Sequence, residues 1–282
     1  MRQVNWLAFK VTLRSPSFPS RFQSPTGSSL NESMPNHTPI LEACVETLTE
    51  AIQAAEAGAS RLEVCASMTE AGTTPSIGLV SAIVDRVGIP AFVMIRPRGG
   101  DFTFDENELD VMRRDIEAVK SAGAQGIVSG ALEPGGAIDR DATQSLIDAA
   151  APLPFTFHRA FDLAPGLEMA LEVLMSIGVR RVLTSGGAST ALVGADAIAR
   201  LARRAGDRVT MVAGGGVRAP HVCELVRLSG VSEVHARPTR MRSTRRVSRG
   251  DVRFGSNAPG VDRSELDPDA VRAIVRALAA TP

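Results

Sequence analysis

From Pro39 onward the chain alternates between two patterns of hydrophobic positions. Short runs rich in branched apolar residues are followed by longer segments in which apolar residues recur every three or four positions. The first pattern is typical of buried parallel strands, and the second of amphipathic helices packed against them. The predicted strands are Leu41–Val45, Arg61–Cys65, Ala91–Arg96, Gly126–Ser129, Pro154–His158, Arg181–Ser185, Val209–Ala213 and Ser232–His235.

Eight strands joined by helices predict one closed (βα)8 barrel, the TIM barrel, as a single domain over residues 39–282. An open doubly wound sheet is the alternative, but the Gly-x-Gly-x-x-Gly typical of that fold does not follow the first strand. A repeated turn supports the barrel, because four helical segments end at a glycine that precedes an apolar strand residue by four positions. We expect each of these glycines to end its helix in the left-handed conformation. They are Gly58, Gly123, Gly178 and Gly230.

Local signals predict several helix ends. Thr47 and Glu50 have the spacing of a capping box, in which each side chain binds the backbone of the other residue. Pro165 suits the first turn of a helix, and the last helix is expected to start at Asp267. Cys223 lies in the helical pattern after the seventh strand, so we expect it in the core.

Composition narrows the classes of partner. The 282 residues include 31 basic and 31 acidic side chains, which gives no reason to expect nucleic acid or a membrane surface as partner. Three cysteines are too few for a disulfide framework, so a reducing cytoplasm is expected. Residues 1–38 are rich in Ser, Pro and Arg and predict a disordered extension; an organellar targeting segment, or a start at Met34, is the alternative.

A basic segment follows the eighth strand over residues 237–253 and begins and ends with an arginine. One interpretation is a lid that binds an anion. The other, which we favour, is a solvated loop, because runs of like charge repel one another and extend into solvent.

Reactive side chains lie near the carboxyl ends of the predicted strands, where barrel enzymes carry their active sites. Glu42 and Cys44 share one face of the first strand, because alternate residues of a strand point the same way. Glu63 and Cys65 share one face of the second strand for the same reason. Carboxylates inside a barrel are costly unless they are paired. The available partners are Arg96 and Arg98, at the end of the third strand.

Further candidates follow the later strands. His158 suits a general acid or base, or a binding residue, held by Asp162. The glycine-rich turns after strands six and seven carry backbone N–H groups of the kind that hold phosphate in such barrels. The other candidates for substrate binding are Asp101, Ser185, Gly186, Gly214, Gly215 and His235.

Two functions fit these residues. Cys44 and Cys65 on adjacent strands bring two thiolates within reach of one soft cation such as Cu(I), unless they only pack as small hydrophobes. Met94 is expected to pack in the core rather than to add a thioether ligand.

The alternative is a lyase, isomerase or epimerase that acts on a small anionic or phosphorylated substrate. Arg96 and Arg98 would hold the anion. The residues assigned to proton transfer are Glu42, Glu63, His158 and Asp162.

Several strings taken together resemble the CutC family of copper homeostasis proteins over about residues 41–235. The most specific are Ile-Arg96-Pro-Arg-Gly-Gly-Asp-Phe and Thr-Phe-His158-Arg-Ala-Phe-Asp. The resemblance implies a TIM barrel in the cytoplasm that self-associates and binds Cu(I) through Cys44 and Cys65. The sequence departs from the family pattern after His235, where small residues are usual and the basic segment begins instead.

Overall fold

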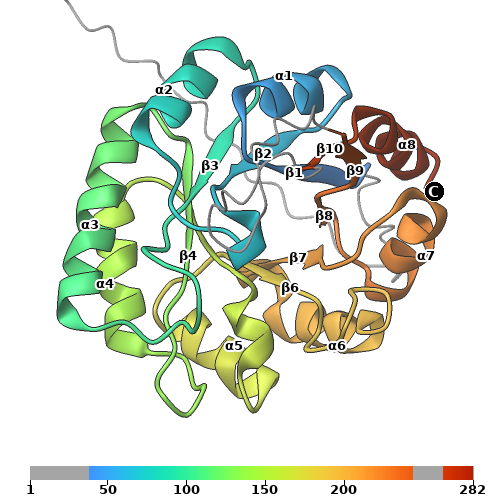
Figure 1. The fold of residues 1–282 in the computed structure, drawn as a ribbon. Coiled ribbons are helices and arrows are strands. Elements are labelled where there is room, and N and C mark those ends of the chain that lie inside the picture. The colour runs from blue at the N-terminus through green and yellow to red at the C-terminus, as the bar shows by residue number, and fades with distance from the viewer. Residues whose placement is uncertain (1–37, 244–262, 282) are drawn as a thin grey trace, which may run out of the picture. The chain divides into compact units, whose positions relative to one another are not determined.

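Eight parallel strands pair in sequence order and form a closed barrel, because β8 also pairs with β1. Helices surround this barrel in the computed structural model, which describes residues 38–243 and 263–281 (Figure 1). The TIM-barrel prediction is confirmed. The strands of the barrel are β1 (Ile40–Val45), β2 (Arg61–Val64), β3 (Ala91–Met94), β4 (Gly126–Ser129), β5 (Phe155–Phe157), β6 (Arg181–Thr184), β7 (Thr210–Gly214) and β8 (Glu233–Ala236).

Each strand lies within two residues of its predicted ends. The α-helices are α1 (Leu48–Glu56), α2 (Ile77–Arg86), α3 (Glu106–Ser121), α4 (Arg140–Ala150), α5 (Leu167–Ser176), α6 (Ala195–Ala205), α7 (Ala219–Ser229) and α8 (Pro268–Ala279). The described residues also form the short 3-10 helices η1 (Met68–Glu70), η2 (Arg159–Leu163) and η3 (Gly206–Arg208). None of the described helices is long and apolar enough to cross a membrane.

The main apolar core lies between the strands and the helices, because one face of each strand packs outward against the helical layer. The barrel interior holds a second, smaller cluster that contains Cys44, Cys65, Phe92, Met94 and Val128. Polar and charged residues occupy much of the remaining interior. The interior is therefore the part of this barrel where chemistry is possible.

Two predictions about helix ends need correction. Thr47 caps α1 by accepting a hydrogen bond from the Glu50 N–H, but the Glu50 carboxylate accepts from the N–H groups of Glu46 and Leu266. Glu50 therefore ties α1 to the chain before α8 instead of completing a capping box. Pro165 lies just outside α5, whose N-cap is Gly166.

Cys223 is exposed on α7 rather than buried in the core. Its thiol lies 3.3 Å from the carbonyl oxygen of Ala277 in α8.

The basic segment after β8 is partly a strand rather than a loop. β9 (Thr239–Arg242) pairs antiparallel with β10 (Arg263–Leu266). Arg240 and Arg242 both pair with Glu265 across this two-stranded sheet. Residues 244–253 of the segment lie outside the described residues, as does the predicted extension up to residue 37.

The four predicted glycine turns are confirmed, since Gly58, Gly123, Gly178 and Gly230 all have φ between +70° and +95°. Left-handed backbone costs a residue with a Cβ about 1–2 kcal/mol. Space differs between the sites: a Cβ on Gly178 would meet nothing within 4 Å, whereas one on Gly123 would lie 2.9 Å from a methyl carbon of Val84.

We therefore predict that Gly178→Ala lowers the free energy of unfolding by about 1 kcal/mol, the cost of the backbone alone. Gly123→Ala should cost distinctly more, because it adds a steric clash to the same strain. Denaturant unfolding of the two variants measures the difference. Equal losses would contradict this account of the turns.

Candidate functional site

The inward faces of β1, β2 and β8 carry a continuous group of polar side chains. The register places the Cα atom of Glu42 opposite those of Arg61 and His235, so one layer of the interior contains all three. Alternation along the strands then brings further residues to the same face. They are Cys44 on β1, Glu63 on β2 with Cys65 directly after that strand, and Glu233 on β8 with Arg237 directly after that strand.

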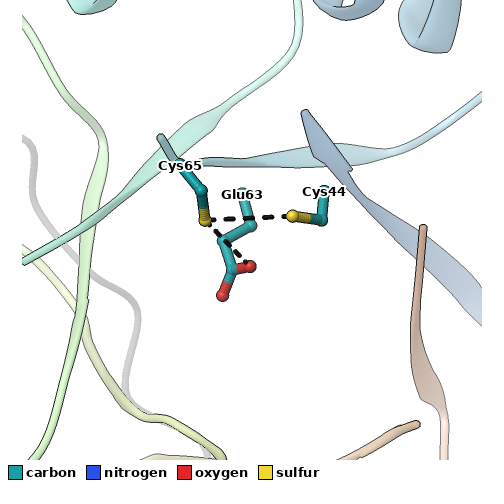
Figure 2. Close-up of side chains that lie close together, drawn as sticks. All are labelled: Cys44, Glu63 and Cys65. Carbon is teal, nitrogen blue, oxygen red and sulfur yellow. Dashed lines mark hydrogen bonds between the residues drawn. The ribbon is translucent and has the colours of Figure 1, made fainter. Parts of the chain in front are cut away.

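Two thiols and a carboxyl group lie close together at the carboxyl ends of β1 and β2 (Figure 2). The Sγ atoms of Cys44 and Cys65 are 3.8 Å apart, and Cys65 Sγ lies 3.4 Å from Glu63 Oε2. All three side chains are buried. The sequence prediction that each glutamate shares a face with its cysteine is confirmed.

A third sulfur, which the sequence analysis did not assign, completes this cluster. The Sδ atom of Met68 lies 3.6 Å from Cys44 Sγ. The Met68 N–H donates to Glu46, whose carboxylate pairs with Arg237. The spacing Cys-x-x-Met from Cys65 is the sequence signal that could have identified it. Met94, by contrast, packs in the interior cluster as expected.

His235 lies between two buried carboxyl groups. Its Nδ1 is 2.9 Å from Glu42, and its Nε2 is 3.6 Å from Glu63. Burial alone would lower the pKa of His235, but Glu63, Cys44 and Glu42 together raise it well above its usual value. The imidazole is therefore a cation at neutral pH.

The two carboxyl groups beside His235 differ in charge. Burial would raise the pKa of Glu42, but the hydrogen bond with His235 and the charges of Arg181 and Arg61 hold it well below its usual range. Burial and the negative charges of Cys44 and Glu42 raise the pKa of Glu63 to about 8, although His235 acts in the opposite direction. Glu42 is thus an anion at neutral pH, and Glu63 is largely protonated.

The two thiols are also inequivalent. The hydrogen bond between Cys44 and Cys65 lowers the pKa of Cys44 to about 5, and His235 also lowers it. The same hydrogen bond raises the pKa of Cys65 well above its usual value. At neutral pH the pair therefore consists of one thiolate and one thiol.

Arg96 and Arg98 do not pair with the interior carboxylates as the sequence suggested. Arg96 is 2% exposed and donates to backbone carbonyl oxygens, among them that of Gly72 at 3.0 Å. Arg98 pairs with Asp101 and Glu108. Both arginines thus hold the loops that follow β2 and β3, although the buried Nε of Arg96 has no hydrogen-bond partner among the described residues.

The actual partners of Glu42 come from the opposite ends of their strands. Arg61 and Arg181 both pair with Glu42 and with Glu233, and both guanidinium groups lie over the ring of Phe92. This cluster compensates a carboxylate that is fully buried.

His158 and Asp162 do not contact each other in the way the sequence suggested. His158 is buried against the rings of Phe102 and Phe157, and its Nε2 has no hydrogen-bond partner among the described residues. Burial lowers the pKa of His158 to about 3. Asp162 instead accepts hydrogen bonds from the glycine turn after β6.

That turn is therefore occupied by a carboxylate of the protein itself. Asp162 accepts from the N–H groups of Ser185 and Gly187, and the Gly186 N–H donates to the Thr184 hydroxyl. The turn predicted to hold phosphate after β6 has these three N–H groups engaged.

A cavity of about 420 Å³ opens at this end of the barrel. Several of the predicted site residues line it, and Met68 and three arginines join them. The predicted residues in its wall are Glu63, His158, Asp162, Gly215 and His235. The cavity thus extends from the sulfur cluster to the turn after β7.

The model of the CutC family matches residues 39–239. The chain belongs to the CutC family. It is 44% identical over 203 residues to the human copper homeostasis protein cutC homolog, covering 71% of this chain and 74% of that one. A CutC family protein from Caulobacter vibrioides is 41% identical over 234 residues, with 83% and 89% covered.

The crystal structure of a CutC protein from Streptococcus agalactiae superposes with a TM-score of 0.67 at 32% identity, covering 70% of this chain and 97% of that one. The CutC match spans all eight strands and every candidate residue named above, and it ends in β9.

The low pKa of His158 predicts acid sensitivity. In the unfolded chain His158 takes up a proton below about pH 6.5, whereas in the folded protein it stays neutral down to about pH 3. The free energy of unfolding therefore falls as the pH drops through this window. Compared with the His158→Phe variant, we expect the parent protein to lose up to about 1.4 kcal/mol of unfolding free energy per pH unit in this window. Unfolding curves of both proteins between these limits test this, and parallel pH profiles would contradict it.

Proposed function

We propose that this CutC-family chain binds Cu(I) at the carboxyl-terminal mouth of its barrel, with Cys44 and Cys65 as ligands and the Met68 thioether beside them. The observation that carries the proposal is the cluster of three sulfur atoms, with 3.8 Å and 3.6 Å between neighbours. Thiolate and thioether ligands favour Cu(I) over hard cations such as magnesium and calcium.

The charges around the thiols support a monovalent cation. Two thiolates and one Cu(I) carry a net charge of about −1, which is costly to bury unless a cation lies nearby. His235 is protonated beside Cys44, and Arg237 donates to the Cys44 carbonyl oxygen at 3.2 Å. Both positive charges stabilise an anionic bis-thiolate complex.

Glu63 lies beside the cysteine pair and not only beside the His235 cation. Burial raises the pKa of Glu63 to about 8, so its carboxyl group is largely protonated in the metal-free protein. Its Oε2 lies 3.4 Å from Cys65 Sγ, and a protonated carboxyl group there can donate a hydrogen bond to the Cys65 thiolate of the loaded site. We therefore assign Glu63 to the support of the cysteine pair rather than to the metal.

A cytoplasmic location goes with this proposal, because free thiols and Cu(I) both persist under reducing conditions. Self-association, which the family resemblance implies, stays a prediction.

Anaerobic titration with Cu(I) against a competing chelator tests the metal site. Cys44→Ser and Cys65→Ser should each weaken binding by at least about 100-fold, because each removes a thiolate ligand. Met68→Leu should weaken it by about tenfold, since it removes a weaker donor at similar volume. Cys223→Ser is the matched control and should bind as the parent does. Equal affinity in the parent and Cys44→Ser would exclude this site.

An enzyme is the second candidate function, and one observation favours it. The cavity is flanked by a carboxyl group that is protonated at neutral pH, Glu63, and by an imidazole that is neutral, His158. Two titratable groups whose pKa values are driven apart by their surroundings suit acid and base roles in isomerase, epimerase or lyase chemistry. Neither Arg96 nor Arg98 lines this cavity, so an anion bound inside it would need other partners.

A further inference from the structure

The glycine turn after β7 has unused backbone donors. Gly215 and Gly216 have φ of +112° and +70°, and neither N–H donates a hydrogen bond within the described part of the chain. Successive N–H groups in such a conformation form a concave binding site for an anion. The corresponding turn after β6 differs, because Asp162 occupies it.

An arginine lies directly against this turn. A Cβ on Gly215 would be 3.4 Å from the guanidinium carbon of Arg159, so the absence of a side chain brings backbone and guanidinium together. Arg159 is held in place by Asp162 at 2.9 Å and by the Ser185 hydroxyl at 2.9 Å. Its remaining nitrogen, Nη1, makes no hydrogen bond to the described residues.

A second arginine follows at the start of α7. Arg218 is the N-cap of this 11-residue helix, which has no side-chain cap. Its side chain is exposed and lines the cavity, and no carboxylate of the described residues pairs with it. The positive end of a helix dipole adds to the same field.

The same cavity holds an unsatisfied buried group. His158 is 3% exposed, lines the cavity, and leaves its Nε2 without a partner among the residues described. A buried polar atom without a partner is costly and points to a ligand that supplies one. The cavity can thus hold the body of a molecule whose anionic group lies at the turn after β7.

We propose that Gly215, Gly216, Arg159 and Arg218 bind the phosphate group of a small molecule, the remainder of which lies in the cavity beside His158. Two guanidinium groups and two N–H donors suit a phosphate dianion better than a single carboxylate. The proposal rests on the second candidate function, for which it supplies the anion-binding residues. It is independent of Cu(I) binding, because no sulfur atom takes part.

Titration of the metal-free protein with inorganic phosphate, followed by amide NMR, tests the site. Phosphate should shift the amide signals of Gly215 and Gly216, and Arg218→Gln should weaken binding about tenfold, the loss of one charge-assisted contact. The matched control is Arg203→Gln, an exposed arginine in the last turn of α6, at the far end of the barrel. Glycerol 3-phosphate should shift the same signals and bind more tightly than inorganic phosphate.

Three results would overturn the proposal, and they have different meanings. Shifts confined to other residues would place the anion elsewhere and leave the enzyme hypothesis standing. No binding of either phosphate compound would remove both. Acetate binding as tightly as phosphate at Gly215 and Gly216 would contradict the assignment to phosphate. The Cu(I) titration is separate, and Cys44→Ser should bind phosphate as the parent does.

Discussion

A carboxylate enclosed in a barrel must be matched by cations, and Glu42 is the group on which the interior of this protein depends. It is fully buried and contacts Arg61, Arg181 and His235. Removing a single partner of a buried ion pair leaves an uncompensated charge, which is strongly destabilising. The arrangement thus fixes three side chains from three different strands.

The protonation states of the functional groups are linked through His235. Glu63, Cys44 and Glu42 together raise the pKa of His235, and His235 adds to the hydrogen bond from Cys65 that favours the thiolate of Cys44. The opposite wall of the cavity is organised by another carboxylate, Asp162, which fixes Arg159 next to the turn after β7. One barrel mouth thereby offers soft sulfur donors on one side and anion-binding groups on the other.

The sequence predicts the barrel well because its signals are local. Apolar runs, helical spacing and the four glycine turns each depend on residues close together in the chain, and the strands follow within two residues. The shared faces of Glu42 with Cys44 and of Glu63 with Cys65 follow from strand alternation in the same way.

The pairings within the site are the part that sequence reasoning misses. The sequence suggests Arg96 and Arg98 as partners of the carboxylates because both follow a neighbouring strand. The true partners, Arg61 and Arg181, depend on the register around the closed barrel. His158 and Asp162 are four residues apart, but the 3-10 turn between them directs Asp162 to the turn after β6. Long-range register and irregular turns carry no local pattern.

The protonation of the cysteine pair tests the central claim most directly. Ultraviolet absorbance of thiolates, followed against pH in the metal-free Cys223→Ser protein, reports Cys44 and Cys65 alone. We expect one thiolate to appear at about pH 5 and a second to appear only well above the usual range of a thiol. Two thiols that titrate together at about pH 8.5, the pKa of an unperturbed cysteine, would contradict an inequivalent pair.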